Sequence, residues 1–377
     1  MKALIVGCGN IGSVAAQDLA ETMAKVGVVV ADYDKAKAEA VVKKISRHNV
    51  SSIQLDITKR ESVKTFKDFD VIMGFLPGPL GYKLAEACIK ARKDLVDVSF
   101  MAENALTLND AANNAGIAIV PDCGLAPGIS NVLVGHAVAN FDKVKAVHIM
   151  VGGLPEKPVP PLNYTITWSP ASLIDEYTRK VGILQKGKPI KVEALTGLEE
   201  IDFPGMGKLE AFYTDGLRTL LHTIKNAEEM WEKTLRYPGH AEKIKTLESL
   251  GYFTEEKIDV EGVGVSPRKL TVKLLGQKLW KPEIKDVVAL KVEVVGYSAG
   301  KKKRYAYHLL DYCDKRRDIT AMARTTAYPA SIVAQMMLEK RIKEKGVVPT
   351  EKLGMTDELY LQFINELKKR GIKIAEN

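Results

Sequence analysis

The first residues whose types and spacing could do chemistry lie near the N-terminus, where residues 7–12 read GCGNIG. This spacing matches the pattern G-x-G-x-x-G, which holds the pyrophosphate of a dinucleotide where a strand turns into a helix. Here the pattern follows an apolar run over 2–6 that predicts a strand, and it opens a predicted helix over 10–25. This context favours a nucleotide site over a glycine-rich turn that binds nothing.

Each position of this loop has a physical role in that interpretation. Gly7 permits the tight turn, Gly9 has no Cβ to keep a pyrophosphate away, and Gly12 lets the helix pack closely on the strand. The N–H groups of Asn10 and Ile11 lie at the predicted helix N-terminus, where the helix dipole attracts phosphate. The loop therefore predicts phosphate binding by backbone groups.

An acidic residue, Asp32, ends the second predicted strand. It lies 20 residues after Gly12 (32 − 12 = 20), which is the separation at which a carboxylate binds the adenosine ribose hydroxyls in dinucleotide folds. Such a carboxylate would repel a 2′-phosphate, and the residues that follow it are Tyr33 and Asp34 rather than Arg or Lys. The sequence therefore predicts NAD, and not NADP, as the cofactor.

Two further strand ends complete the predicted cofactor site, because ligands of open α/β sheets bind outside the carboxyl ends of the strands. Asp56 closes the third strand and Ile57 follows it, beside the expected position of the adenine. A helix cap explains Asp56 equally well, with Thr58 as the rival cap. Leu76 and Pro77 lie in the turn after the fourth strand, where we expect the nicotinamide ribose.

Two acids stand where the fifth and sixth strands end, near the expected nicotinamide. They are Asp97, with Ser99 close behind it, and Asp122. One acid at a strand end can simply cap the next helix. Two acids and a hydroxyl above one crevice favour the binding of a cation such as an amine. Asp97 or Asp122 would hold an ammonium or take its proton, with the order between them open, and Ser99 would contact both substrate and cofactor.

These residues need a scaffold that gathers strand ends, and the first 120 residues predict one. Apolar runs alternate there with amphipathic stretches, which is typical of βαβ units in a doubly wound parallel α/β sheet with helices on both faces. After about residue 122 longer strand-like runs dominate, for example 144–151, 163–168 and 287–297. They predict an α+β domain with a mostly antiparallel sheet. An Ala/Met-rich helical stretch over 319–345 would then pack on the first domain.

The predicted division has three parts. A discontinuous dinucleotide-binding domain covers 1–125 plus 318–350, an α+β domain is inserted over 126–317, and a helical tail covers 351–377.

Composition excludes several classes of protein. Of 377 residues, 46% are hydrophobic and 27% charged, enough apolar surface to exclude disorder over most of the length. No apolar run approaches 18 residues, and the N-terminal run is too short and too soon polar for a signal peptide. The four cysteines form no CxxC pair and predict reduced thiols in a cytoplasmic protein without a metal site.

The chain carries a formal net charge of +8 and one dense basic run, residues 301–304. A run of this kind can bind nucleic acid when aromatic residues interleave with it. No aromatic residue interleaves with this run, which lies between two strand-like stretches. We therefore expect an exposed hairpin turn there, with neither nucleic acid nor a membrane as a partner.

The sequence as a whole resembles the saccharopine dehydrogenase superfamily, and most closely its lysine 6-dehydrogenase branch. The resemblance reaches from the N-terminus to about residue 340 and is carried by six segments: GCGNIGSVAAQDL, MGFLPGPLGYKLAEACIKA, LVDVSFMAEN, PDCGLAPGISNVLVG, TLRYPGH and MARTTAYPASIVAQMM. It implies a Rossmann domain and an inserted α+β domain that binds an amino-acid substrate and forms a homodimer or higher homo-oligomer. It also implies NAD(P)-linked chemistry at a C–N bond.

The motif TLRYPGH supplies three further candidates. Arg236 matches the family's substrate-domain arginine, and a planar guanidinium suits the α-carboxylate of an amino acid. Tyr237 would position the same carboxylate, and His240 would relay a proton. An ordinary salt bridge for Arg236 and a structural role for His240 remain as alternatives. His222, on a predicted apolar helix, is expected in the core.

The saccharopine-forming branch often carries a basic residue where this chain has Asp32, which favours NAD-linked lysine oxidation. The expected reaction is NAD-dependent oxidative deamination of L-lysine at its ε-amine. The amine loses a proton, the adjacent carbon releases hydride to the nicotinamide, and water hydrolyses the imine. The products are ammonia, NADH and 2-aminoadipate 6-semialdehyde, which cyclises to piperideine-6-carboxylate. The alternatives are a saccharopine-type dehydrogenase or reductase acting on a secondary amine, a diamine substrate, and a non-catalytic NAD-binding redox sensor.

Overall fold

The structure is a computed structural model that describes residues 1–376, and the chain forms two compact units. Unit 1 contains Met1–Asn140 and Ala323–Lys373, and unit 2 contains Phe141–Met322 together with the residues from Ile374 on. The division thus falls at 140 and 322, later than the expected positions near 125 and 317. Residues 351–373 belong to unit 1 and do not form a separate tail.

Unit 1 is built on a seven-stranded sheet whose neighbouring strands all run parallel. The strands, in the order of the sheet, are β17 (Gly346–Val347), β6 (Ala118–Val120), β5 (Asp94–Asp97), β4 (Val71–Gly74), β1 (Lys2–Val6), β2 (Gly27–Asp32) and β3 (Val50–Gln54). The strand order reverses between β1 and β4, so a crevice opens at their carboxyl ends in this doubly wound arrangement. The predicted α/β fold class is confirmed.

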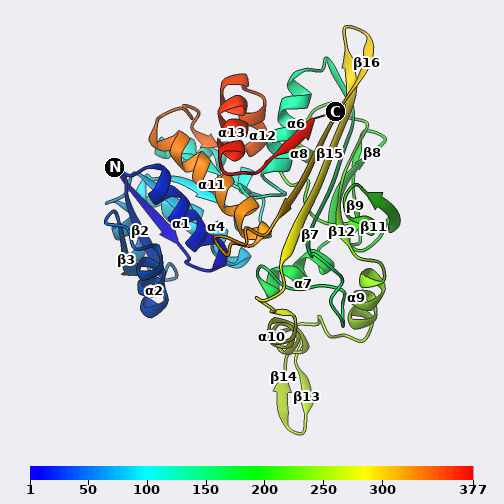
Figure 1. Ribbon diagram of the computed structural model, residues 1–377, viewed down its shortest axis with the longest axis horizontal. Helices are drawn as coiled ribbons and strands as arrows, with labels where there is room; N and C mark the ends of the chain where they lie inside the picture. The colour runs from blue at the N-terminus through cyan, green and yellow to red at the C-terminus, as the bar shows by residue number, and fades with distance from the viewer. Residues whose placement is uncertain (377) are drawn as a thin grey trace. The chain divides into compact units, whose positions relative to one another are not determined.

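The helices of unit 1 follow the strands in alternation (Figure 1). They are α1 (Asn10–Thr22), α2 (Lys35–Ile45), α3 (Ser62–Phe66), α4 (Gly78–Ala91), α5 (Asn109–Ala115), α6 (Ile129–Ala139), α11 (Ala321–Leu338), α12 (Thr350–Gly354) and α13 (Asp357–Lys369). Glycines fit α6 closely against α12, because a Cβ on Gly354 would collide with the carbonyl oxygen of Val132 and one on Gly135 with that of Glu351. This packing moves the boundary of unit 1 beyond residue 125.

Unit 2 contains a nine-stranded mixed sheet, in agreement with the predicted α+β class. The path of the sheet is β10 (Glu199–Phe203), β11 (Gly207–Tyr213), β12 (Glu229–Arg236), β7 (Lys143–Pro155), β15 (Asp286–Ser298), β16 (Lys301–Tyr312) and β18 (Ile374–Glu376), with β8 (Val181–Gln185) joining β12 to β9 (Lys188–Val192). β12 and β7 are parallel, and the other neighbours are antiparallel. The expected strand over 163–168 does not form; that segment packs Tyr164 and Ile166 into the core.

The remaining elements of unit 2 are α7 (Pro170–Thr178), α8 (Leu220–Thr223), α9 (His240–Ser249), α10 (Pro267–Leu279) and the small hairpin of β13 (Ile258–Val260) and β14 (Val263–Val265). β15 and β16 make a long hairpin, visible in Figure 1. The basic run 301–304 forms the exposed start of β16, and the turn itself is Ala299–Gly300, with φ of 50° and 73°. Over residues 1–376, the helices are all too short or too polar to cross a bilayer.

The C-terminal helix α13 is tied to unit 1 by a buried ion pair. Arg370 donates from Nε to both carboxylate oxygens of Asp18 on α1, at 2.8 and 3.0 Å, and from Nη1 to Glu366 at 2.6 Å. The side chains of Arg370 and Asp18 are 6% and 5% exposed. Burial raises the pKa of Asp18, and Arg370 opposes that shift. Arg370 therefore stabilises the ionised form of the buried Asp18 side chain.

We expect Arg370→Met to lower the free energy of unfolding by about 3 kcal/mol, because it leaves the Asp18 carboxylate buried without its cation. Urea unfolding followed by circular dichroism measures the change. The matched control is Arg341→Met, which breaks the exposed pair of Arg341 and Glu358 and should cost less than about 1 kcal/mol. Equal losses in the two variants would contradict the proposed anchoring of α13.

Candidate functional site

The glycine loop after β1 has the geometry that a pyrophosphate requires. Gly7 has φ +94°, and a Cβ there would lie 2.5 Å from the carbonyl oxygen of Phe75. A Cβ on Gly12 would collide with the carbonyl oxygen of Gly7, so the turn and α1 are in direct contact. A Cβ on Gly9 would meet no heavy atom of residues 1–376 within 4 Å. The backbone at Gly9 thus faces open space, where a phosphate can approach it.

Helix α1 begins directly after this loop. Its N-cap is Gly9, which has no side chain to accept the N–H groups of the first turn. Asn10 is exposed and Ile11 half-buried, so both predicted phosphate-binding residues lie near the surface of unit 1. Because the N-cap residue provides no side-chain oxygen, an anion bound at this helix N-terminus can accept from the N–H groups of the first turn and interact with the helix dipole.

Asp32, at the end of β2, is bonded to the same loop. Its Oδ2 accepts from the backbone N–H of Cys8 at 3.0 Å and from the Cys8 thiol at 3.2 Å, and its Oδ1 accepts from the backbone N–H of Asp34 at 3.1 Å. Burial alone would raise the pKa of Asp32, but these hydrogen bonds outweigh it and the pKa is lowered. Asp32 is therefore a fixed negative charge beside the glycine loop.

The other predicted cofactor residues lie at the same edge of the sheet. Leu76 follows β4, and its side chain is so close to the loop that a Cβ on Gly7 would lie 3.2 Å from it. Pro77 is the N-cap of α4. Asp56 accepts from the hydroxyl and the N–H of Thr58, at 2.7 and 3.0 Å, and the hydroxyl bond is the main cause of its lowered pKa. Asp56 therefore holds a turn and caps no helix; Ile57 packs partly against the core.

The structure brings the predicted reaction residues of unit 1 together but buries them. Asp97 is fully buried at the end of β5, and Ser99 donates to it from its N–H at 2.9 Å and from its hydroxyl at 2.5 and 2.7 Å. Burial raises the pKa of Asp97 to about 7; the Ser99 hydrogen bonds oppose the shift, and the charge of Asp122 adds to it. Asp122 has φ +53° and is also buried.

Cys123 and Gly74 pack directly against Asp97. Gly74 leaves it space, because a Cβ there would collide with its Oδ1. The N–H of Cys123 donates to the carbonyl oxygen of Asp97 at 2.9 Å. Burial, with Asp97 and Asp122 nearby, raises the pKa of the Cys123 thiol far above its usual range. Asp97 therefore holds the chain between β5 and β6, and a base role remains a prediction.

The buried Asp97 predicts a pH-dependent stability. Its pKa is about 4 when unfolded and about 7 when folded, so ionisation opposes folding and the free energy of unfolding falls as the pH rises through this window. Asp97→Asn should make that slope shallower by up to about 1.4 kcal/mol per pH unit. Urea titrations between pH 4.5 and 8 measure it.

Ser99→Ala is the matched variant for this measurement. It removes the hydroxyl hydrogen bonds that lower the pKa of Asp97 and keeps the one from the backbone N–H, so the sloping region should extend to higher pH. Parallel pH profiles for the wild type and Asp97→Asn would show that Asp97 does not titrate in this range.

Arg236 ends β12 in unit 2 and is buried among internal partners. It donates from Nη2 to Glu176 at 2.9 Å, from Nε to the Tyr177 hydroxyl at 3.2 Å and from Nη1 to the Leu235 carbonyl oxygen at 2.9 Å. Its guanidinium lies 4.7 Å from the ring centre of Tyr164. The ordinary salt bridge that the sequence left open is thus present. Of the five guanidinium N–H donors, these bonds use three.

His240 begins α9 and is engaged through both ring nitrogens. Nδ1 lies 2.7 Å from the Leu162 carbonyl oxygen and Nε2 lies 2.9 Å from the Tyr177 hydroxyl. A carbonyl only accepts, so Nδ1 carries the proton and Nε2 accepts from Tyr177. Burial, and then the charge of Arg236, lower the pKa of His240 to about 3. The neutral ring therefore positions Tyr177, which in turn accepts from Arg236.

Two other predicted side chains of unit 2 have different surroundings. The hydroxyl of Tyr237 donates to the Pro155 carbonyl oxygen at 2.9 Å and lies 3.2 Å from that of Glu156, so Tyr237 binds the end of β7. His222 is exposed on α8, a helix of only four residues, and the expected core position is wrong. The structure therefore does not bring Tyr237 to the partners of Arg236.

The sequence did not single out Glu176, Tyr177 or Tyr164 as partners of Arg236. Glu176, on helix α7, and Arg236 are 60 residues apart in the sequence. Nothing in the spacing of residues along α7 shows which of its polar side chains is buried. A polar residue at a clearly buried position in each of the two segments is the only sequence signal that could have revealed these partners of Arg236.

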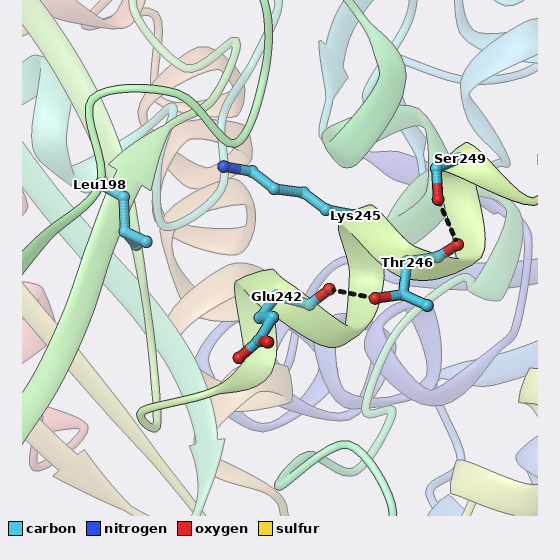
Figure 2. A pocket seen from close by; sticks show the side chains of 5 residues that line it. All are labelled: Leu198, Glu242, Lys245, Thr246 and Ser249. Atoms are coloured by element: carbon cyan, nitrogen blue, oxygen red, sulfur yellow. Dashed lines mark hydrogen bonds between the residues drawn. The ribbon is translucent and has the colours of Figure 1, made fainter.

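One surface hollow of unit 2, about 530 Å³ in volume, is lined by α9 and Leu198 (Figure 2). It contains none of the predicted residues. Thr246 and Ser249 donate their hydroxyls to carbonyl oxygens of their own helix, so the charged side chains of Glu242 and Lys245 are the main polar groups of its lining. Among residues 1–376 no cluster of three or more His, Cys, Asp or Glu side chains could hold a metal, and all four cysteines are free and buried.

Two family models match consecutive parts of the chain. Residues 3–120 match the saccharopine dehydrogenase NADP binding domain, and residues 124–372 match the saccharopine dehydrogenase C-terminal domain. The chain belongs to the saccharopine dehydrogenase family. The predicted superfamily is confirmed, and the lysine 6-dehydrogenase branch stays a prediction. Residues 3–120 are thus the family's nucleotide-binding domain, and they contain the glycine loop and Asp32.

Individual relatives in the saccharopine dehydrogenase family are similar to this chain over most of its length. Alpha-aminoadipic semialdehyde synthase of Arabidopsis thaliana is 25% identical over 94% of the chain and 41% of its own length. Carboxyaminopropylagmatine dehydrogenase of Synechocystis is 22% identical over 93% of the chain and 92% of its own length. The chain spans less than half the length of the first curated relatives it matches.

A solved structure has the same fold. The apo saccharopine dehydrogenase (L-Glu forming) of Saccharomyces cerevisiae aligns with a TM-score of 0.78 at 21% identity, over 100% of this chain and 99% of that one. At this identity the likeness concerns the fold.

Proposed function

We propose that this member of the saccharopine dehydrogenase family is an oxidoreductase that uses NAD to oxidise a C–N bond of a lysine-related amine. The observation that carries the proposal is the Asp32 carboxylate, which Cys8 holds beside a glycine loop open at Gly9. Relatives named for saccharopine and carboxyaminopropylagmatine support the class of substrate. When bound, the nicotinamide accepts the hydride.

The residues at this edge fit a dinucleotide. Gly7, Gly9 and Gly12 would shape the loop, the first turn of α1 would bind the pyrophosphate, and Asp32 would accept from the ribose hydroxyls. The matching family domain is described as NADP-binding, but a fixed carboxylate beside the loop disfavours a 2′-phosphate. NAD is therefore the proposed cofactor.

Wild-type protein should bind NADH more tightly than NADPH, and Asp32→Ser should shift the ratio of the two dissociation constants toward NADPH by tenfold or more, about 1.4 kcal/mol. The removed charge no longer repels the 2′-phosphate. Nicotinamide fluorescence titration measures both constants. Asp70→Asn is the control, because Asp70 accepts from the N–H of Lys2 at the opposite end of the sheet. Tighter NADPH binding by the wild type would refute the NAD assignment.

Within this class we propose oxidative deamination of L-lysine at the ε-amine, giving ammonia, NADH and 2-aminoadipate 6-semialdehyde, which cyclises to piperideine-6-carboxylate. Arg236 would bind the α-carboxylate with the N–H donors that its internal partners leave. Asp97 or Asp122 would hold the ammonium or take its proton. The proposed assembly is a homodimer or higher homo-oligomer.

A second candidate is oxidation of a secondary amine, as in saccharopine. It is favoured by the names of several relatives, among them the yeast saccharopine dehydrogenase [NADP(+), L-glutamate-forming], which is 26% identical over 76% of this chain. Saccharopine carries an additional carboxylate-bearing arm on the amine nitrogen, so its oxidation would yield two organic products. Its use would leave the fold and the nucleotide site unchanged.

NADH formation, followed by absorbance, distinguishes these candidates. With NAD and L-lysine alone we expect turnover; turnover only with saccharopine supports the second candidate.

Arg236→Lys should raise KM for the amino acid at least tenfold, about 1.4 kcal/mol, and leave KM for NAD unchanged, because a point charge loses the fork geometry. Arg268→Lys is the control, because it alters an ion pair with Asp175, the neighbour of Glu176 on α7. Tight NADH binding without turnover of any amine would favour a redox sensor.

A further inference from the structure

A line of buried polar side chains in unit 2 leads toward Arg236. Glu232, Thr234 and Arg236 alternate along β12 and therefore share one face of the strand. Thr214, just after β11, lies 2.8 Å from Glu232 Oε2 and 2.8 Å from the Thr234 hydroxyl. Thr234 lies 2.7 Å from Glu176 Oε1. The line thus joins one carboxyl group, two hydroxyls and a second carboxyl group.

Counting protons along this line shows that one carboxyl group is protonated. The line contains three oxygen–oxygen contacts of 2.7 to 2.8 Å, and each needs one shared proton to be a hydrogen bond. The two threonine hydroxyls supply two protons. Two buried oxygens at 2.8 Å without a proton between them would repel. The third proton therefore resides on Glu232 or on Glu176.

The surroundings assign this proton to Glu232. Glu176 Oε2 accepts from Arg236 at 2.9 Å, so the positive charge of the guanidinium lies directly beside the Glu176 carboxylate. Glu232 is 3% exposed and has no cation bonded to it among the described residues. The charged groups that act on it are Glu176 on α7, Asp215 after β11 and Arg236 on its own strand; burial is the largest cause of its strongly raised pKa.

We propose that Glu232 stores a proton at neutral pH and exchanges it with Glu176 through the hydroxyls of Thr214 and Thr234. In the forward step the Glu232 O–H gives its proton to Thr214, Thr214 gives its own to Thr234, and Thr234 gives its own to Glu176. Glu232 becomes a carboxylate, Glu176 becomes a carboxylic acid, and both hydroxyls are regenerated. No electron or other group moves.

This exchange brings a proton to a position beside Arg236, where the side chain of Glu176 is 13% exposed. An ammonium substrate must lose a proton before hydride leaves the adjacent carbon. Glu232 already holds a proton at rest and cannot take that one; the line instead supplies a proton to Glu176 for the reverse reaction, in which the newly formed amine gains a proton, provided that Arg236 binds the substrate. This last step rests on the proposed function, whereas the protonation of Glu232 does not. Glu232 and the two threonines are positioning residues that act through Glu176.

Infrared difference spectroscopy tests the stored proton, since a carboxylic acid absorbs apart from a carboxylate. At pH 7 the spectrum of the wild type minus that of Glu232→Gln should show an acid band, whereas the band of Asp97, whose pKa is about 7, is common to both proteins and cancels. Gln supplies the third hydrogen as an N–H, so the line and the fold should persist. Glu293→Gln is the control and should keep the band, because Arg304 lowers the pKa of Glu293. A difference spectrum of wild type and Glu232→Gln that contains no acid band overturns the proposal.

Thr234 tests the coupling. Thr234→Val removes two of the three contacts and leaves the Thr214 hydroxyl free to donate to Glu232, which stabilises the ionised form of Glu232. The midpoint of the acid band should therefore fall by about one pH unit or more. Thr234→Ser keeps the hydroxyl and should leave the midpoint unchanged. An unchanged midpoint in Thr234→Val overturns the exchange. The spectra need no substrate, so failure of the proposed reaction would leave both results interpretable.

Discussion

The hydrogen bonds from Cys8 to Asp32 are the interaction on which the proposed function depends. They join the loop after β1 to the end of β2 and keep a carboxylate ionised although it is buried. A negative charge fixed in this way is in place without a bound nucleotide. The open backbone at Gly9 and the tight contact of Gly12 with Gly7 then define where a pyrophosphate can lie.

Unit 2 uses buried charge differently. Arg236 is held by Glu176 and Tyr177, and Tyr177 is held by a neutral His240. Each of these groups fills a hydrogen-bonding requirement of the next, so the guanidinium has one defined orientation. A buried arginine oriented by a carboxylate is rigid, which suits the proposed recognition of a planar carboxylate.

The sequence anticipated the elements of unit 1 well. Alternating apolar and amphipathic stretches identified its strands and the doubly wound class, because burial on both faces of a parallel sheet gives long apolar runs. The pattern in unit 2 was less informative. The run 163–168 alternates like a strand but packs into the core without a partner strand, and a helix expected around residue 220 has four residues. Alternation records burial, not strand pairing.

By itself the sequence determined the nucleotide-binding fold and the residues at its strand ends, since local spacing dictates which residues follow a strand. Tertiary structure alone decided what those residues touch. It buried Asp97 under Ser99, paired Arg236 with a glutamate 60 residues away and placed Glu232 at the end of a line of hydroxyls. The protonation of a carboxyl group depends on burial and on neighbours brought together by folding, and neither is a property of the chain order.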